Sequence, residues 1–243
     1  MEQIIKWFEG VWASIVAWGI DVAETFEKCF IRNDRWTMLL EGIGVTLEIT
    51  LFAAILGVII GFLIALCNLS KSKPLRLFGK IYTDIIRGTP SVTQLMIIYF
   101  VVFANIHWAK WIIAAIAFAI NSGAYVSETI RGGILSIDKG QTEAGRSLGL
   151  SARQTMMSIV APQAIKNIFP ALCNEFITLL KETAIVGYIG LVDIQKAGDF
   201  IKTATLEAFM PLIGTAIIYF VIIKVLTLLL GLIEKKLRKS DQR

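Results

Sequence analysis

The sequence predicts an all-α integral membrane protein built around five membrane-spanning helices. Hydrophobic residues make up 56% of the 243-residue chain and the mean hydropathy is +0.68, both above the values of soluble domains. Five apolar stretches are each long enough to cross a hydrocarbon core, which takes about 20 helical residues. The net charge is +5, but the basic residues lie between the apolar stretches, a pattern that controls topology and argues against nucleic-acid binding.

The predicted spans are residues 45–67, 81–104, 111–131, 167–190 and 210–233. The first span contains the pattern Gly57-x-x-x-Gly61, which lets two helices approach closely. The fourth span is the least typical, because Glu175, Lys181 and Glu182 interrupt it. Charged side chains inside a membrane need a partner or a water-filled site, so such residues usually have a function.

The distribution of basic residues sets the predicted orientation. Residues 68–83, between the first two spans, contain four basic residues and no acid, and the chain after the fifth span is also basic. Positively charged segments stay in the cytoplasm, so five spans place the N-terminus outside and the C-terminus inside. The predicted domains are a membrane domain over residues 37–235 and a basic cytoplasmic tail over 236–243.

Residues 1–36 are predicted to form a separate N-terminal segment, which is not a cleavable signal peptide because it lacks a basic start and a cleavage site. Its apolar run over residues 11–20 is too short to cross a bilayer, and charges surround it. The apolar residues that recur at helical spacing are Ile4, Phe8, Trp12, Ile15, Val22, Phe26 and Phe30. We expect an amphipathic helix on the outer membrane surface. A sixth, tilted span is the alternative.

No metal site, nucleotide site or catalytic constellation is predicted in this chain. The three cysteines (Cys29, Cys67 and Cys173) and the single histidine (His107) do not have the spacing of metal ligands. The phosphate-binding pattern Gly-x-x-x-x-Gly-Lys-Ser/Thr does not occur in the sequence. We therefore expect no cofactor and no enzymatic activity in the chain itself.

The segment between the third and fourth spans, residues 132–166, is far longer than the connection at 104–110 and contains a predicted helix. Asp138 is a good N-cap, and Gln141 stands three residues later in the position of a capping box. Gly149 is a good C-terminal stop. The helix between them, Lys139 to Leu148, would be about 15 Å long.

A second helix is predicted directly after the first. Ser151 caps it, Gln154 completes another capping box, and Pro162 limits it. A short, capped helix held between two membrane spans can act as a mechanical element. The side chains of Ala144 and Gly145 are small, so the first helix has a narrow cross-section there and can enter a groove on a partner.

Charged residues of the first helix offer further contacts to a partner. Glu143 and Arg146 can anchor the helix by their opposite charges. A capped loop helix without a partner is the structural alternative, and helix spacing alone does not decide between the two.

The loop over residues 143–162 reads Glu-Ala-Gly-x-x-x-Gly, then nine residues, then Ile-x-Ala-Pro. It closely resembles the EAA loop of bacterial ABC-importer permeases, whose pattern is Glu-Ala-Ala, three residues, Gly, nine residues, Ile-x-Leu-Pro. Two positions depart from that pattern, Gly145 and Ala161. Both exchanges are small or apolar, although Gly145 loosens the helix by about 0.5–1 kcal/mol. The resemblance implies that Glu143, Ala144, Gly145, Arg146 and Gly149 couple the chain to an ATPase.

Three further segments resemble permeases of the polar-amino-acid uptake group, the His/Glu/Gln/Arg type. They are Arg87-Gly-Thr-Pro with Gln94, the third span from residue 121 to 134, and the fourth span from 174 to 183. In the fourth, Glu182 stands where the group usually has Asp. The resemblance covers about residues 40–235 and excludes the N-terminal helix.

The resemblance implies a five-helix permease core of the type I importer fold in the bacterial cytoplasmic (inner) membrane. It implies four kinds of partner: two ATP-binding-cassette ATPase subunits, a second permease that is either a copy or a paralogue, an extracytoplasmic solute-binding protein, and an amino acid as substrate. ATP and Mg would be bound by the ATPase subunits, not by this chain. The sequence does not say which amino acid is carried.

Five residues are candidates for binding this amino acid: Thr89, Gln94, Glu128, Lys181 and Glu182. Glu182 and Glu128 can accept hydrogen bonds from an ammonium group, and the other three can donate to a carboxylate. The structural alternative is that Glu128 pairs with Arg131 and that Lys181 binds helix ends.

Two other functions remain open at this stage. A permease for another class of small solute would have the same coupling loop. An ATP-independent secondary transporter or channel would need its own coupling-ion site and usually more spans or inverted repeats, which are not visible here.

Overall fold

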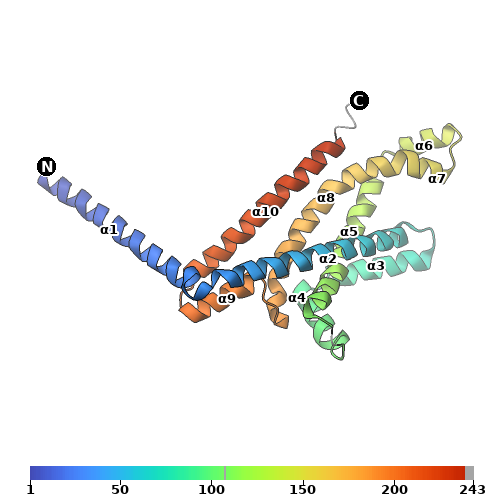
Figure 1. The fold of residues 1–243 in the computed structure, drawn as a ribbon. Coiled ribbons are helices and arrows are strands. Elements are labelled where there is room, and N and C mark those ends of the chain that lie inside the picture. The colour runs from blue at the N-terminus through green and yellow to red at the C-terminus, as the bar shows by residue number, and fades with distance from the viewer. Residues whose placement is uncertain (107, 239–243) are drawn as a thin grey trace.

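The structure, a computed structural model, describes residues 1–106 and 108–238, without the side chains of residues 2–4, 6, 8, 9 and 238. Within these residues the chain is helical and contains no strand, as the sequence predicts (Figure 1). Three features considered in the sequence lie outside the described part: His107, the tail from residue 239, and the side chains of Ile4 and Phe8.

The α-helices are α1 (Glu2–Phe26), α2 (Trp36–Leu69), α3 (Lys73–Arg87), α4 (Ser91–Ile97), α5 (Lys110–Leu135), α6 (Lys139–Ser147), α7 (Ala152–Thr155), α8 (Ala161–Glu182), α9 (Ile194–Thr205) and α10 (Phe209–Arg238). Turns of π-helix cover Glu27–Ile31, Ile98–Val102 and Met156–Val160, and 3-10 turns cover Arg32–Asp34 and Thr183–Ile189. We call the end of the bundle that carries α6 the α6 end, and the opposite end the α9 end.

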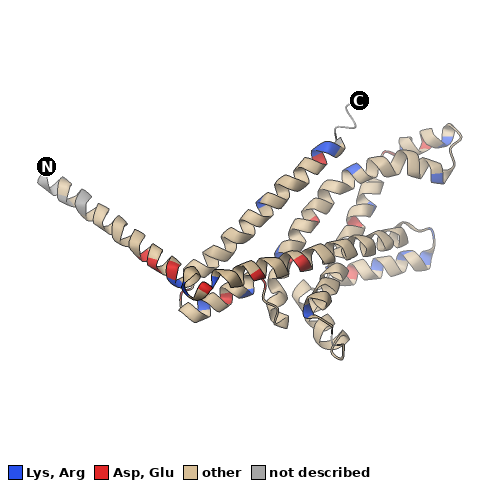
Figure 2. Ribbon diagram, in the orientation of Figure 1, with Lys and Arg blue, Asp and Glu red and all other residues tan. Residues whose placement is uncertain are grey.

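Helix α5 forms the centre of the bundle. In its most apolar window 67% of the residues are buried, against 39% in α2 and none in α10, so α10 is peripheral. The main core cluster includes Ile49 and Ala53 of α2, Ala114 and Phe118 of α5, and Leu179 of α8. Figure 2 shows charged residues along α3 and at the C-terminal end of α10, with long uncharged stretches in α2 and α10.

Helices α2 and α5 approach each other at the Gly57-x-x-x-Gly61 pattern. A side-chain carbon on Gly61 would lie 2.5 Å from Cγ1 of Val126, and one on Gly57 would lie 3.2 Å from Cβ of Ser122. Real side-chain carbons do not come as close as the first of these distances, so the contact at Gly61 needs glycine. The predicted close approach is confirmed, and α5 is the partner helix.

Replacing Gly61 by alanine is expected to lower the stability of the folded chain by about 1–3 kcal/mol, the usual range for overpacking a close contact. The midpoint of thermal unfolding in detergent measures this effect. Gly44→Ala is the matched control, because Gly44 lies in the same helix with nothing within 4 Å of an added carbon. Equal unfolding midpoints for the two variants would contradict the assigned contact.

The second predicted span, residues 81–104, is not one continuous helix. Helix α3 ends at Arg87 and α4 begins at Ser91, and the two helical segments are bent by 105° relative to each other. The cause is Pro90, which has no N–H for a helical hydrogen bond and disfavours helical conformation in the preceding residue. The expectation of an uninterrupted span is therefore wrong here, and α3 with α4 forms a broken span or a re-entrant loop.

Among the described residues, three helices are long and apolar enough to cross a membrane: α2, α5 and α10. The bent pair α3–α4 makes a fourth span if it is counted as one. Helix α8 does not meet the same standard, and it begins earlier and ends earlier than the predicted span 167–190, with a 3-10 turn that continues to Ile189. The all-α membrane fold is confirmed, and the number of five spans stays a prediction.

At the α9 end, the buried residue Asp193 connects three helices. Its carboxylate accepts hydrogen bonds from the backbone N–H groups of Gln195 (3.2 Å) and Lys196 (3.0 Å) and from the hydroxyl of Tyr219 (3.1 Å). Helix α2 packs on the same residue, because a side-chain carbon on Gly42 would lie 2.7 Å from its carbonyl carbon. Burial raises the pKa of the Asp193 carboxyl above its ordinary value, and the three donors offset part of that effect.

Helix α1 extends away from the other helices (Figure 1). Every residue from 10 to 20 is exposed, and the side chains of Trp12 and Trp18 are exposed by 69% and 68%. The helix joins the bundle through Phe30, which is buried in a cluster with Leu39 and Ile201. The predicted helix is present, and its position on the outer membrane surface stays a prediction.

Candidate functional site

A polar layer crosses the bundle at the break between α3 and α4. Because Pro90 has no N–H, the carbonyl of Ile86 loses its usual helical donor. The side-chain amide of Gln94 replaces it, with Nε2 2.7 Å from the Ile86 oxygen and 2.6 Å from Oγ1 of Thr89. Asn121 of α5 donates to Oε1 of Gln94 over 2.9 Å. The amide that the sequence analysis assigned to a substrate carboxylate is therefore used within the chain in this conformation.

Glu175 of α8 lies against the same layer. Ser122, the neighbour of Asn121 in α5, donates from Oγ to Oε1 of Glu175 over 2.9 Å. Both residues line a cavity of about 100 Å³ between α2, α5 and α8. Glu182 follows seven residues later, which is two helical turns, so it lies on the same face of α8. This face therefore presents two carboxylates about 10 Å apart along the helix.

Glu128 does not belong to this layer. It pairs with Arg131, whose Nη2 lies 2.7 Å from Oε2 of Glu128, which is the alternative that the sequence left open. Glu128 stands six residues beyond Ser122 toward the α6 end, whereas Glu182 stands seven residues beyond Glu175 toward the α9 end. At 1.5 Å per residue, the two carboxylates are roughly 20 Å apart along the bundle. A single pocket that contains both is not formed.

Lys181 and Thr89, which were predicted to donate to a substrate carboxylate, do not lie together with the carboxylates of α8. Lys181 is exposed, and it points about 100° around the helix from Glu182. Thr89 donates its hydroxyl proton to the carbonyl of Ile85 over 2.9 Å. Among the described residues, neither side chain shares a hydrogen bond with the carboxylates of α8.

Helices α6 and α7 form a hairpin at the α6 end (Figure 1), which we call the α6–α7 hairpin (residues 138–160). Asp138 caps α6 as predicted, and its Oδ1 accepts the N–H of Gly140 over 2.6 Å. Gln141 does not complete the predicted capping box, because its side chain faces Gln163 at 3.5 Å instead. Gly149 ends the helix with φ +83°, a conformation that glycine adopts without steric cost.

Gly145 faces the inside of the hairpin. A side-chain carbon there would lie 2.8 Å from Cγ2 of Thr155 and 2.9 Å from Cδ1 of Ile159. This corrects the expectation that Gly145 lowers the surface offered to a partner, because the missing side chain lets α6 pack on its own chain. Glu143 is two residues away, about 200° around the helix, so it projects outward.

The outer surface of the hairpin combines charge with apolar groups. Glu143 and Ala144 are exposed, and Leu148 is exposed by 81% at the tip. Arg146 is partly engaged, because its Nη1 donates to the carbonyl of Leu150 over 2.8 Å and fixes the turn. The hairpin therefore exposes a carboxylate and, at its tip and roughly 140° around the helix, a large apolar side chain, and both are accessible to another protein.

The second half of the hairpin continues into the bundle. Ser151 and Gln154 form the predicted capping box, with hydrogen bonds of 3.2 Å and 2.8 Å. Pro162 does not end the second helix, contrary to the prediction, because the chain stays helical through it: the π-turn Met156–Val160 leads directly into α8, and Pro162 lies in the first turn of α8. Helix α7, the π-turn Met156–Val160 and α8 thus form one helical path from Ala152 to Glu182.

The start of α8 is also attached to the end of α5. Asn167 donates from Nδ2 to Oγ of Ser136 over 3.0 Å. Ile168 packs directly on Gly133, where no side chain would fit. The hairpin is therefore directly connected to the helix that carries Glu175 and Glu182.

Sequence reasoning missed four residues of this arrangement: Asn121, Ser122, Glu175 and Leu148. Asn121 and Ser122 are neighbouring polar residues in a largely apolar helix, which is a signal that could have found them. Glu175 was noted for interrupting its span and was not assigned to the substrate. Leu148 had no signal, because a leucine near the end of a helix is ordinary in sequence.

Comparisons with known proteins identify the family of the chain. Residues 57–239 match the sequence family described as "Binding-protein-dependent transport system inner membrane component". The match covers most of the chain, and the chain belongs to this family. Membership confirms the resemblance to ABC-importer permeases found in the sequence.

Several relatives share most of their length with this chain. The protein GlnP of Rickettsia bellii, provisionally named a glutamine transport system permease protein, is 44% identical over 214 residues, which are 87% of this chain and 98% of GlnP. The arginine transport system permease protein ArtQ of Bacillus subtilis is 42% identical over 205 residues, which are 84% of this chain and 94% of ArtQ.

One solved structure supports the fold directly. It is described as the crystal structure of an amino acid ABC transporter with histidines, and its chain is 42% identical to this one. The two superimpose with a TM-score of 0.79 over 85% of this chain and 98% of the other. A structure of the MetNI methionine ABC transporter, 18% identical with a TM-score of 0.73, shares the fold.

Proposed function

We propose that this chain is the transmembrane permease subunit of an ATP-binding-cassette importer that takes up a polar amino acid. The observation that carries this proposal is the α6–α7 hairpin, which is capped at both helices and continuous with α8. Its outward residues, Glu143 and Leu148, have the chemistry of a contact with a separate ATPase subunit. The chain needs such a subunit, because its sequence has no ATP-binding loop.

The hairpin supports a simple route for coupling. ATP binding and hydrolysis in the ATPase would shift the hairpin as a rigid body. Because α7 and α8 form one helical path, the shift would move Glu175 and Glu182 relative to α5. The hydrogen bond from Ser122 to Glu175 lies at this moving contact. Alternation between outward and inward access would then follow from a change in the contact between the C-terminal half of α8 and α5, because the N-terminal part of α8 stays attached to α5 at Gly133 and Ser136.

The carboxylates of α8 support an amino acid as substrate. Two carboxylates on one helix face can accept hydrogen bonds from an ammonium or guanidinium group, and a carboxylate at membrane depth needs such a partner. Relatives named for glutamine, arginine and cystine transport point to the same substrate class. Glu182 carries one methylene more than the Asp that is usual in the group, which would alter the fit of the substrate.

The assembly proposed for this chain contains two ATPase subunits, a second permease and an extracytoplasmic solute-binding protein. The basic residues after α2, Lys71 in the connection and Lys73, Arg76 and Lys80 in α3, support the predicted orientation in the cytoplasmic membrane, with the N-terminus outside and the C-terminus inside. The α6 end would then face the cytoplasm and the α9 end the binding protein. ATP hydrolysis would take place only in the ATPase subunits.

Reconstitution tests this function. In proteoliposomes that contain the chain with its ATPase subunits and binding protein, uptake of labelled arginine or glutamine is expected to fall at least about tenfold when ATP is replaced by a non-hydrolysable analogue. Uptake that continues without the ATPase subunits would establish a secondary transporter instead. ATP-driven uptake of a different solute, with no amino acid bound by the binding protein, would establish another substrate class.

We propose further that α1 lies on the outer face of the cytoplasmic membrane. Its exposed tryptophans, Trp12 and Trp18, have the size and polarity of residues at the head-group level. An epitope fused ahead of Met1 is expected to be removed by a protease added outside intact cells. Protection of the epitope until the cells are opened would show that α1 crosses the membrane as a sixth span.

A further inference from the structure

A second polar cavity lies toward the α6 end, apart from the layer of Gln94 and Glu175. It has a volume of about 300 Å³ and lies between the end of α2, one face of α3 and the last third of α5. The charged residues that line it are Arg76, Lys80, Asp84, Arg87, Glu128 and Arg131. Four are cationic and two are anionic, so the lining carries a net charge of +2.

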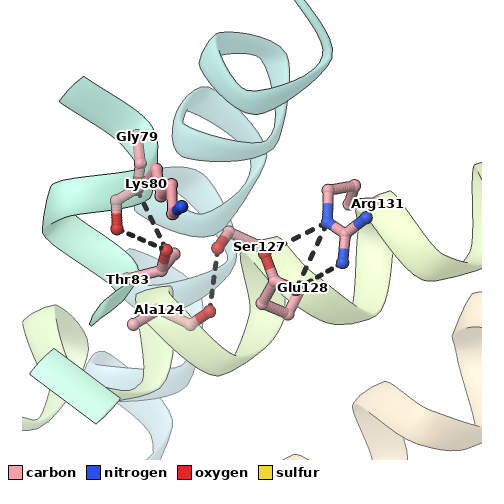
Figure 3. Close-up of polar contacts among 7 residues, drawn as sticks. All are labelled: Gly79, Lys80, Thr83, Ala124, Ser127, Glu128 and Arg131. Carbon is pink, nitrogen blue, oxygen red and sulfur yellow. Dashed lines mark hydrogen bonds and ion pairs between the residues drawn. The ribbon is translucent and has the colours of Figure 1, made fainter. Parts of the chain in front are cut away.

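Some of the cationic side chains that line this cavity have partners within the described part of the chain, and others do not. Figure 3 shows Glu128 and Arg131 of α5 paired with each other, beside Lys80 and Thr83 of α3. Arg87 lies over the ring of Tyr125, 5.4 Å from its centroid. Arg76 and Lys80, in contrast, have no such partner for their charged groups among the described residues.

Arg76 and Lys80 lie four residues apart on one face of α3 and are both exposed. Within the described part of the chain, neither side chain has a recorded hydrogen bond or an ion pair within 4.0 Å. They are therefore available to an anion. A guanidinium and an ammonium group side by side are the usual ligands of a phosphate group.

The surface next to the cavity is apolar. Next to the basic residues, α3 has a row of exposed apolar side chains. They are Leu77, Ile81 and Ile85, which are exposed by 59%, 49% and 58%. These side chains suit contact with acyl chains rather than water. One helix, which directly follows the apolar helix α2, therefore presents a cationic stripe and an apolar stripe side by side.

We propose that this cavity binds the phosphate group of an anionic phospholipid, with Arg76 and Lys80 as ligands and with the acyl chains along Leu77, Ile81 and Ile85. Basic pockets between membrane helices at the membrane boundary are suited to anionic head groups. Inorganic phosphate has the same ligand chemistry and lacks the acyl chains. This site is distinct from the proposed substrate layer, and it does not depend on transport activity.

Lipid binding by the full chain in its detergent-solubilised assembly tests the proposal. Native mass spectrometry is used to titrate phosphatidylglycerol, with phosphatidylcholine as the neutral comparison. The double variant Arg76→Gln, Lys80→Gln is expected to bind phosphatidylglycerol about 25-fold more weakly, because each basic residue near a lipid surface contributes about fivefold. Binding of phosphatidylcholine is expected to stay unchanged.

Two matched variants make the outcome specific. Lys71→Gln, Lys73→Gln removes two charges from the same part of the chain outside the cavity lining, and it is expected to weaken binding much less than the cavity variant does, because neither side chain lines the cavity. Arg76→Lys, Lys80→Arg keeps both charges and is expected to retain binding. A loss in the outside variant equal to that in the cavity variant would overturn the site, since it would show only a general charge effect.

Competition separates the sources of the anion. Inorganic phosphate alone is expected to displace phosphatidylglycerol poorly, because it gains no contact with Leu77, Ile81 and Ile85. Displacement by millimolar inorganic phosphate would overturn the lipid assignment and leave a soluble anion as the ligand. Displacement by a transported amino acid would also overturn it and place the cavity on the substrate path.

Discussion

The variant Glu143→Lys is expected to reduce ATP-driven uptake at least about tenfold, while the chain is still inserted in the membrane at a normal level. Glu143 projects from α6 on the side opposite the buried Gly145, and it makes no recorded ion pair within the described residues. Reversal of a charge that is paired across a protein contact costs about 2–5 kcal/mol, and about 1.4 kcal/mol already corresponds to tenfold. Uptake into proteoliposomes and co-purification of the ATPase subunit measure the effect.

The matched control for this variant is Thr142→Lys, which places a lysine on the neighbouring exposed residue, about 100° around the helix. It is expected to keep more than about half of the uptake, because a peripheral charge contributes little to affinity. Normal uptake and normal ATPase retention in Glu143→Lys would contradict the proposed contact. An equal loss in both variants would show that the surface is sensitive to any lysine.

The variant Glu182→Gln is expected to weaken substrate transport about tenfold or more, with an unchanged amount of protein in the membrane. Glutamine has nearly the same shape as glutamate and removes only the charge, so the loss reports on binding of a cationic group and not on packing. Glu175→Gln is expected to act in the same direction, since both carboxylates lie on one face of α8. The concentration dependence of uptake, measured for arginine and glutamine, checks both variants.

The control for the carboxylates is Ser122→Ala, which removes the hydrogen bond to Glu175 and keeps its charge. It is expected to cost about 0.5–1.5 kcal/mol of stability at most and to change the apparent affinity less than threefold, or about 0.65 kcal/mol. If Ser122→Ala and Glu175→Gln lose affinity equally, the carboxylate acts through packing. If Glu182→Gln lowers only the amount of protein, that residue is structural.

The long apolar helices and the caps could be predicted from sequence because they depend on residues close together in the chain. Helices α2, α5 and α10 follow from long, predominantly apolar runs. Asp138, Gly149 and Ser151 set the ends of α6 and α7 through contacts with residues close by in the sequence. The break at Pro90 was also visible in the sequence Arg-Gly-Thr-Pro. The span was nevertheless predicted over residues 81–104 as a whole, because apolar residues recur before Arg87 and after Gln94.

Other features could not be predicted because they depend on how distant elements meet. The inward direction of Gly145 depends on the angle between α6 and the turn that carries Thr155 and Ile159. The separation of Glu128 from Glu182 depends on the register between α5 and α8, which no local pattern sets. The role of Gln94 required knowledge that its amide reaches back to the carbonyl of Ile86.

Photo-crosslinking at position 148 tests the central claim most directly. A photo-activatable phenylalanine analogue in place of Leu148, in the intact assembly, is expected to crosslink to an ATPase subunit with a yield that changes when ATP is added. The same analogue in place of Leu77, on the apolar face of α3, is expected to give no crosslink to that subunit. If no position between 139 and 162 crosslinks to an ATPase, the hairpin does not receive force from one, and the proposed importer function is wrong.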